Sequence, residues 1–211
     1  VEQLDNIYEA EIDSSKKLID SLKMSIETIM KNTMYRDDLQ EYKIKDVCKY
    51  VNGPGHKVGD GCDNGDYPLL RSSINNKLKW LNTYDHEGPN VIIGPGGNFN
   101  IHYYRKFSVS GGCGGGGKML VLINNDMIDL YYLYHIIKTN NEDMNGMYRG
   151  AALKHIDKNE FENYKIRIPP TEVQREILKQ IEPKEKLIAD LELNIVNANK
   201  EAKGIMNILF N

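Results

Sequence analysis

The stretch that decides the fold is the C-terminal arm, residues 171–211, which reads TEVQREILKQIEPKEKLIADLELNIVNANKEAKGIMNILFN. Mostly apolar side chains recur along this arm at steps of four and three residues: Ile177, Ile181, Lys184, Ile188, Leu191, Ile195, Ala198, Ala202, Ile205 and Leu209. A period of about 3.5 residues is the spacing that a coiled-coil seam requires. The pattern therefore predicts a long helix that packs along another helix.

The N-terminal arm carries a matching stripe. Residues 4–34 contain no Gly or Pro and place these side chains at the same steps: Tyr8, Ile12, Ser15, Ile19, Leu22, Ile26 and Ile29. A lone helix cannot bury such a stripe, so we expect the two arms to pair antiparallel, within one chain or across a dimer. The alternative is that both arms fold onto the central domain as ordinary helices. Pro183 is expected to kink the C-terminal helix or to divide it in two.

Between the arms, the composition and the period both change. Residues 42–170 carry a net charge of +3, against −5 for residues 1–41 and −1 for residues 171–211, and they hold 17 of the 18 glycines. Short stretches typical of strands occur at residues 67–71, 90–93, 101–109, 119–123 and 165–168, with one clear helix at 129–139. The sequence thus predicts an α+β fold. We expect a compact domain of many short strands with one or two helices at 42–170, flanked by coiled-coil helices at 1–41 and 171–211.

Composition excludes several classes of protein. No run of about 18 apolar residues exists, so we expect no membrane span. The three cysteines, Cys48, Cys62 and Cys113, are too few for a disulfide scaffold and indicate a reducing compartment, which predicts a cytoplasmic protein.

One local motif suggests phosphate binding but lacks the other requirements of that chemistry. Gly112–Lys118 has the spacing of a phosphate-binding loop, yet Met119 follows where Ser or Thr should hold magnesium, and a strand follows where a helix should begin. The chain has no CxxC, HxH or HExxH pattern, so we expect neither a metal nor a cofactor. A cysteine-dependent transferase that uses Cys113 remains an alternative, because five histidines could serve as its base.

Polar and basic residues gather in the loops of the positively charged block. The candidate DNA-binding residues are Arg71, Ser72, Ser73, Lys77, Lys79, Asn98, His102, Arg105, Lys118, Arg149, Lys154 and His155. Arg and Lys can recognise guanine in the major groove and Asn can recognise adenine, while the amides of Gly-rich loops can approach phosphates. The alternative is that these are ordinary solvated charges.

Five stretches of the sequence follow one another in a characteristic order: Tyr42–Val47 (YKIKDV), Tyr67–Ser73 (YPLLRSS), Val91–Asn98 (VIIGPGGN), Phe107–Ser110 (FSVS) and Tyr148–Gln174 (YRGAALKHIDKNEFENYKIRIPPTEVQ). Together they resemble a target recognition domain in the specificity subunits of type I DNA restriction-modification enzymes. In that family an isoleucine-proline-proline string and a Glu-x-Gln open a long helix, as Ile168–Gln174 does here.

The resemblance implies an architecture and partners. A full subunit of the family has two recognition domains, each followed by a helix, and the two helices form an antiparallel coiled coil. That coiled coil separates two DNA half-sites and docks the adenine-N6 DNA methyltransferase subunits, which a restriction (translocase and nuclease) subunit joins. This chain resembles the C-terminal half of such a subunit, or a half-size subunit that forms a homodimer through its helices.

The same resemblance implies a chain that binds double-stranded DNA and catalyses nothing itself. Adenine methylation needs a polar residue before a Pro-Pro pair and an aromatic residue after it, whereas Ile168 and Thr171 flank Pro169-Pro170 here. The alternative from another class is a coiled-coil assembly or scaffold protein whose globular domain binds protein.

Overall fold

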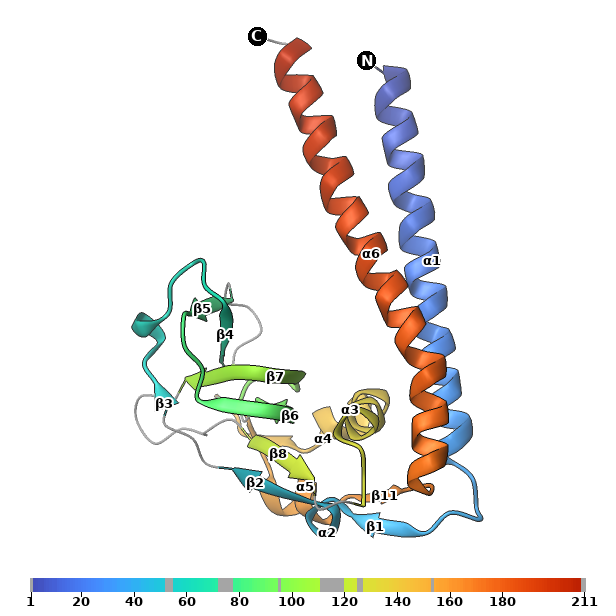
Figure 1. Ribbon diagram of the computed structural model, residues 1–211, viewed down its shortest axis with the longest axis vertical. Coiled ribbons are helices and arrows are strands. Elements are labelled where there is room, and N and C mark those ends of the chain that lie inside the picture. Colours follow the sequence, from blue (N-terminus) through green and yellow to red (C-terminus); the bar gives the residue numbers. More distant parts are fainter. Residues whose placement is uncertain are drawn as a thin grey trace. The chain divides into compact units, whose positions relative to one another are not determined.

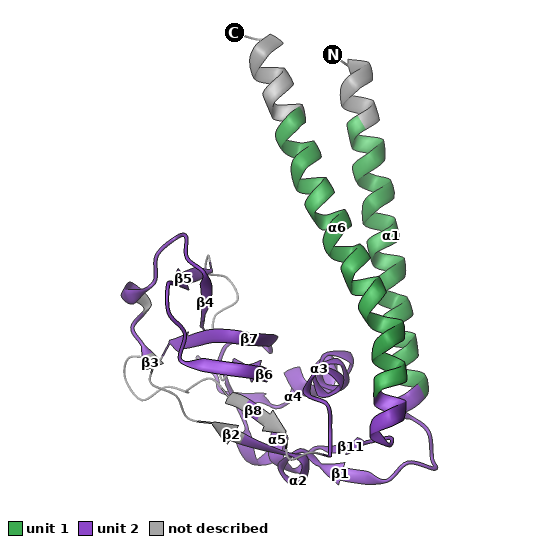
Figure 2. Ribbon diagram, in the orientation of Figure 1, with its two compact units in different colours: residues 1–32, 175–211 green, residues 33–174 purple. Residues whose placement is uncertain are grey.

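The chain folds into two compact units. The computed structural model describes residues 2–51, 55–71, 78–94, 96–110, 120–124, 127–152 and 154–209. Val1–Asn32 and Arg175–Asn211 form one unit, here called the helical unit, and Thr33–Gln174 form the other, here called the central unit (Figure 2).

The helical unit is a pair of long helices. α1 (Glu2–Met34) and α6 (Thr171–Leu209) run side by side in opposite directions (Figure 1). The side chains of Ile19 and Ile188 are buried, which is what the stripes of the sequence require of a seam. The Nζ atom of Lys23 lies 3.3 Å from Oε1 of Glu192 and bridges the two helices. The predicted antiparallel pairing of two long helices is therefore confirmed.

Pro183 does not divide α6, so the predicted split into two helices is wrong. The helix continues from Thr171 to Leu209 with Pro183 in its interior. A proline there removes one backbone hydrogen bond, from its own position to the carbonyl four residues earlier. Both Pro183 and Lys179 are exposed, so water can satisfy that carbonyl, while the buried Ile181 and Ile188 hold the helix on either side.

A sheet of short strands forms the centre of the central unit. Its order is β2 (Cys48–Val51), β8 (Leu120–Asn124), β6 (His86–Ile93), β7 (Ile101–Ser110), β4 (Tyr67–Leu70) and β5 (Lys79–Leu81), and β3 (Gly55–His56) also pairs with β7. Neighbours along this order are antiparallel except β4 and β7, and β3 is also parallel to β7. Leu70, Ile92, Phe107 and Val109 form a buried cluster within the sheet.

Within the described residues, five helical segments and two two-stranded sheets complete the unit. The helical segments are α2 (Ile44–Val47), η1 (Val58–Asp60), α3 (Leu130–Thr139), α4 (Asn141–Gly146) and α5 (Lys158–Asn163). α3 packs on β6 and β7. It begins where predicted, because the Asp129 carboxylate accepts hydrogen bonds from the backbone N–H groups of Tyr131 (2.7 Å) and Tyr132 (3.3 Å). β9 (Tyr148–Arg149) pairs with β10 (His155–Ile156).

The chain enters and leaves the central unit along one two-stranded sheet. β1 (Glu41–Lys43) pairs antiparallel with β11 (Lys165–Arg167), and Lys43 and Lys165 are register partners. The N–H of Ile168 also donates to the carbonyl of Gln40 at 3.2 Å. This sheet brings the two ends of the segment between residues 43 and 165 next to each other.

Gln174 ties the beginning of α6 to the segment before α3. Its side chain is fully buried. Oε1 accepts from the N–H of Asp129 at 2.8 Å, and Nε2 donates to the carbonyls of Pro169 (2.9 Å) and Met127 (3.2 Å). One amide side chain thus satisfies three backbone groups, which explains physically why Gln stands at this position.

Candidate nucleic-acid interface

The loop between β6 and β7 is held in one conformation. Asn100 closes it, because the N–H of Gly94 donates both to Oδ1 of Asn100 (2.9 Å) and to its carbonyl (3.2 Å). A Cβ at Gly94 would collide with the Asn100 side chain, and Gly97 adopts φ +84, which side chains rarely tolerate. The glycines that made this stretch look like a turn are therefore needed for its shape.

The hairpin of β9 and β10 is joined to this loop by hydrogen bonds. The Tyr148 hydroxyl donates to the carbonyl of Gly94, and the N–H of Gly97 donates to the carbonyl of Lys154 at 2.9 Å. Gly96 and His155 form an antiparallel bridge. Two loops that lie about 60 residues apart in the sequence thus form one edge.

This edge brings together four of the predicted DNA-binding residues, here called the loop cluster: Asn98, Arg149, Lys154 and His155. All four are exposed. His155 and Arg149 are register partners in the hairpin. Arg149 is engaged with Glu160, at 2.8 Å between Nη2 and Oε2, so Lys154 and Asn98 are the members best placed to meet a ligand.

Two other predicted residues lie at the opposite end of β7. β4 runs parallel to β7 with Leu70 opposite Val109, so Arg71 follows the end of β7 that is distant from the loop cluster. Lys79 in β5 is paired with Asp63, at 2.7 Å between Nζ and Oδ1. At about 3.3 Å per residue, the length of β7 separates these residues from the loop cluster by roughly 30 Å.

Arg105 and His102 lie in β7, between these two ends. Arg105 is exposed, and no ion pair or hydrogen bond joins it to another described residue. His102 is half-buried, and burial lowers the pKa of its imidazole, so the ring is neutral near pH 7. Arg105 therefore supplies the exposed positive charge at mid-strand. Ser72, Ser73, Lys77, Lys118 and Cys113 lie outside the described residues, as does the Gly111–Gly117 run.

The tyrosines beside β7 were not among the residues that the sequence predicted to bind DNA. The ring of Tyr103 in β7 lies 4.7 Å from that of Tyr131 and 6.1 Å from that of Tyr134, both in α3, measured between centroids. Lys138 places Nζ 5.0 Å from the centre of the Tyr134 ring and donates to its hydroxyl at 3.0 Å. We call Tyr103, Tyr131, Tyr134 and Lys138 the tyrosine cluster. The spacing 131, 134, 138 marks one helical face, but it also fits a core stripe.

His135 is buried behind these rings. Its side chain is 1% exposed, and burial, with a smaller contribution from the Lys138 charge, lowers the pKa of the imidazole to about 3. The ring is therefore neutral in the folded chain, and the positive charge of this region comes from Lys138.

Acid should destabilise the central unit through His135. In the unfolded chain the ring binds a proton below its ordinary pKa of 6.5, whereas the folded chain does not until about pH 3, so stability falls as the pH drops between these values. At about 1.4 kcal/mol per pH unit, the loss from pH 6.5 to about pH 5 is roughly 2 kcal/mol. Urea unfolding of the parent and of His135→Phe across this range measures it. Burial also lowers the pKa of His86, which is common to both chains, so the difference between them isolates His135. Equal pH dependence of the two chains would contradict the assignment.

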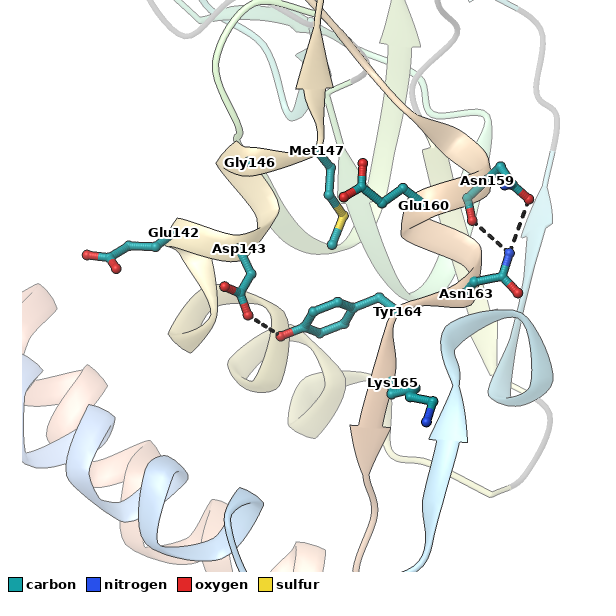
Figure 3. A pocket seen from close by; sticks show the side chains of 9 residues that line it. All are labelled: Glu142, Asp143, Gly146, Met147, Asn159, Glu160, Asn163, Tyr164 and Lys165. Atoms are coloured by element: carbon teal, nitrogen blue, oxygen red, sulfur yellow. Dashed lines mark hydrogen bonds between the residues drawn. The ribbon is translucent and has the colours of Figure 1, made fainter.

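An acidic hollow opens elsewhere on the central unit. It has a volume of about 930 Å³ and is lined by Glu142, Asp143, Gly146, Met147, Asn159, Glu160, Asn163, Tyr164 and Lys165 (Figure 3). The Tyr164 hydroxyl donates to Asp143 at 2.7 Å, and burial together with that carboxylate raises the pKa of the phenol. Lys165 is paired with Glu41 at 2.7 Å and Glu160 with Arg149 at 2.8 Å, so Glu142 and Asp143 give the lining its negative charge. Such a surface repels phosphate, which makes the hollow a poor site for DNA.

A metal site is not apparent in the part of the chain that the structure describes. Within it, no three His, Cys, Asp or Glu side chains gather in a way that could hold an ion. Among the helices in the described residues, none combines the length and the apolarity that a membrane span needs.

Comparison with known proteins identifies the family. The sequence model of the type I restriction modification DNA specificity domain matches residues 36–198, which include nearly all of the central unit and much of α6. The chain belongs to this family. The matched region, residues 36–198, contains the loop cluster, Arg105 and the tyrosine cluster.

Relatives and solved structures agree with this membership. The chain is 28% identical over 185 residues to the specificity subunit of the type I restriction enzyme MjaVIII of Methanocaldococcus jannaschii, covering 82% of the chain and 42% of the relative. It is 24% identical over 178 residues to a putative type I specificity subunit of Mycoplasma pneumoniae, covering 82% and 47%. The chain thus spans about half the length of these relatives.

Two solved specificity subunits share the fold. The S subunit of a type I restriction-modification system from M. genitalium superposes with a TM-score of 0.61 at 13% identity, over 98% of the chain and 56% of that subunit. The HsdS subunit from Thermoanaerobacter tengcongensis gives a TM-score of 0.57 at 12% identity, again over 98% and 56%. At these identities the likeness concerns the fold, a strand-rich domain flanked by long helices.

Proposed function

We propose that the chain is a DNA specificity module of a type I restriction-modification system, in which the central unit reads one half-site of double-stranded DNA. The observation that carries this proposal is the loop cluster: polar and basic side chains are exposed on two loops that backbone hydrogen bonds join to each other, in a member of the DNA specificity family. A single recognition module has contact area for roughly 3–5 base pairs.

The side chains of the proposed DNA-binding surface fall into two classes, those that can read a base and those that can bind a phosphate. The Asn98 amide can form paired hydrogen bonds with adenine, and the Arg105 guanidinium can do so with guanine. Lys154 at the loop edge fits a phosphate, which fixes the position of the duplex without reading its sequence. Arg71, Lys79, Arg149, His102 and His155 complete the proposed surface, together with Ser72, Ser73, Lys77 and Lys118.

We also propose the protein partners of the chain from its membership of the family. The helical unit would dock adenine-N6 methyltransferase subunits, which in turn meet the restriction subunit, and two copies of a half-size subunit would pair through the same helices. The chain itself would bind DNA without catalysing a reaction. Its sparse cysteines support a cytoplasmic location. The proposed boundaries are helix 1–41, recognition domain 42–170 and helix 171–211.

Replacing Arg105 with Ala tests the assignment of base reading. A preferred duplex is first selected from a random pool with the parent chain. We expect Arg105→Ala to weaken binding to that duplex by roughly 1–3 kcal/mol and to relax selectivity at one position, because a paired contact to a base is lost. Titration of the selected duplex and of its single-base variants measures both effects.

Lys106→Ala is the matched control, since Lys106 is the next residue of β7 but is engaged with Glu87 (3.4 Å) and Tyr84. If Arg105→Ala and Lys106→Ala bind every duplex equally, Arg105 does not read a base. Binding by the parent chain that is insensitive to salt would overturn the proposed function itself and favour a protein-binding scaffold.

A further inference from the structure

The tyrosine cluster presents hydrogen-bond donors on its outer edge. The rings of Tyr131 and Tyr134 are nearly parallel, with an interplanar angle of 6° and centroids 6.0 Å apart, and both contact Tyr103. All three tyrosines are half-buried, while Lys138 is exposed. The faces of the three rings therefore mainly contact one another. The groups that a partner can reach are polar: the tyrosine hydroxyls and the Lys138 ammonium.

Tyr134 and Lys138 form a pair that brings a hydroxyl and an ammonium group next to each other. Because the Tyr134 oxygen accepts from Lys138 Nζ at 3.0 Å, the proton of that hydroxyl must be donated elsewhere. No other described residue accepts it. A ligand that accepts from both the phenol and the ammonium must carry adjacent acceptor oxygens and negative charge, which is the description of a phosphate.

The location of this pair connects it to the surface proposed above. Tyr103 and Arg105 are two residues apart in β7, so their side chains share a face of the strand. Tyr103 in turn contacts Tyr131 and Tyr134. A duplex whose bases meet Arg105 would thus have its backbone within reach of α3. Asp129, the carboxylate at the beginning of α3, accepts hydrogen bonds from the backbone N–H groups of Tyr131 and Tyr132.

We propose that Tyr134 and Lys138 together hold one backbone phosphate of the duplex that Arg105 reads, as a contact that positions DNA without reading sequence. This inference rests on the proposed function. It assigns the tyrosine cluster a role in binding, with Tyr103 and Tyr131 as positioning residues that fix the Tyr134 ring. The predicted partner is a nucleic-acid phosphate rather than an apolar protein surface, because the exposed groups are donors.

Two substitutions should separate the ammonium from the hydroxyl. The full chain is titrated with a mixed-sequence duplex between about 50 and 200 mM salt. Lys138→Gln should lower the slope of log affinity against log salt by about 0.9 and weaken binding roughly 5-fold near 0.15 M, since one fewer counterion is released. Tyr134→Phe keeps the ring and the charge, so it should weaken binding roughly 2- to 10-fold with the slope unchanged.

Lys165→Gln is the charge-matched control, because Lys165 belongs to the acidic hollow. Lys138→Arg retains the charge and should restore the slope, which separates loss of charge from misfolding. The inference is overturned if Lys138→Gln keeps the slope of Lys165→Gln, or if its loss of affinity differs between duplex sequences. If the parent chain then still shows a steep slope of log affinity against log salt, the proposed function stands. A flat slope in the parent chain overturns both the proposed function and this inference.

Discussion

Replacing Ile188 with Asp should open the helical unit, at a cost of about 4 kcal/mol in the free energy that holds α6 against α1. Ile188 is 9% exposed and lies in the middle of the seam. Exposing its side chain forfeits roughly 1.5–3 kcal/mol of apolar burial, and a carboxylate in its place must be desolvated or protonated. Amide hydrogen exchange along α6 measures this opening free energy directly.

Leu187→Asp provides the comparison. It is the same change one residue earlier, at a side chain that is 41% exposed, and it should cost less than about 1 kcal/mol. If both substitutions have the same effect on hydrogen exchange, the apolar stripe does not hold the two helices together.

Gln174→Leu should destabilise the central unit by about 3 kcal/mol although the two side chains are similar in size. The Asp129 N–H and the carbonyls of Pro169 and Met127 lose their shared partner, and a buried backbone group without one costs roughly 1–3 kcal/mol. The beginning of α3 and the beginning of α6 should loosen together. Urea unfolding gives the total, and hydrogen exchange at Asp129 locates it.

Gln180→Leu is the control on the same helix. Gln180 is exposed and donates only to the carbonyl of Glu176, at 3.3 Å, one turn away. We expect its replacement to change stability by less than about 0.5 kcal/mol. Equal losses in the two variants would show that Gln174 acts through helix propensity rather than through its three bonds.

The long helices could be predicted from sequence because their signal is repeated many times. Ten seam positions in the C-terminal arm agree on one period, and even Pro183 does not outweigh them. β7 was also located, at residues 101–109, since alternation over several residues is a local property. Only residues 90–93 of β6 were predicted, whereas the strand begins at His86. β3, β9 and β10 are two residues long, too short to show a period. β3 pairs with the distant β7, whereas β9 and β10 pair with each other.

The candidate site was predicted less completely, for a related reason. Lys79 and Arg149 look like free cations in the sequence, but Asp63 and Glu160 neutralise them in the fold. The hydrogen bond between Gly97 and Lys154 depends on a contact between distant parts of the chain. Tyr134 and its neighbours fit a buried stripe equally well, and their half-exposed edge becomes visible only when α3 is placed on β7.

The sheet of β1 and β11 has a consequence for how such a gene can evolve. Lys43 and Lys165 face each other across two neighbouring strands, so the ends of the intervening segment lie roughly 5 Å apart. Recombination that replaces everything between them with a foreign segment of similar end spacing would leave the seam between α1 and α6 in place, while the bonds of Gln174 to Asp129 and Met127 would have to be formed again with the new segment. Under the proposed function, a lineage could in this way acquire a new DNA preference by exchanging one segment through two crossovers, without re-evolving the seam between its long helices.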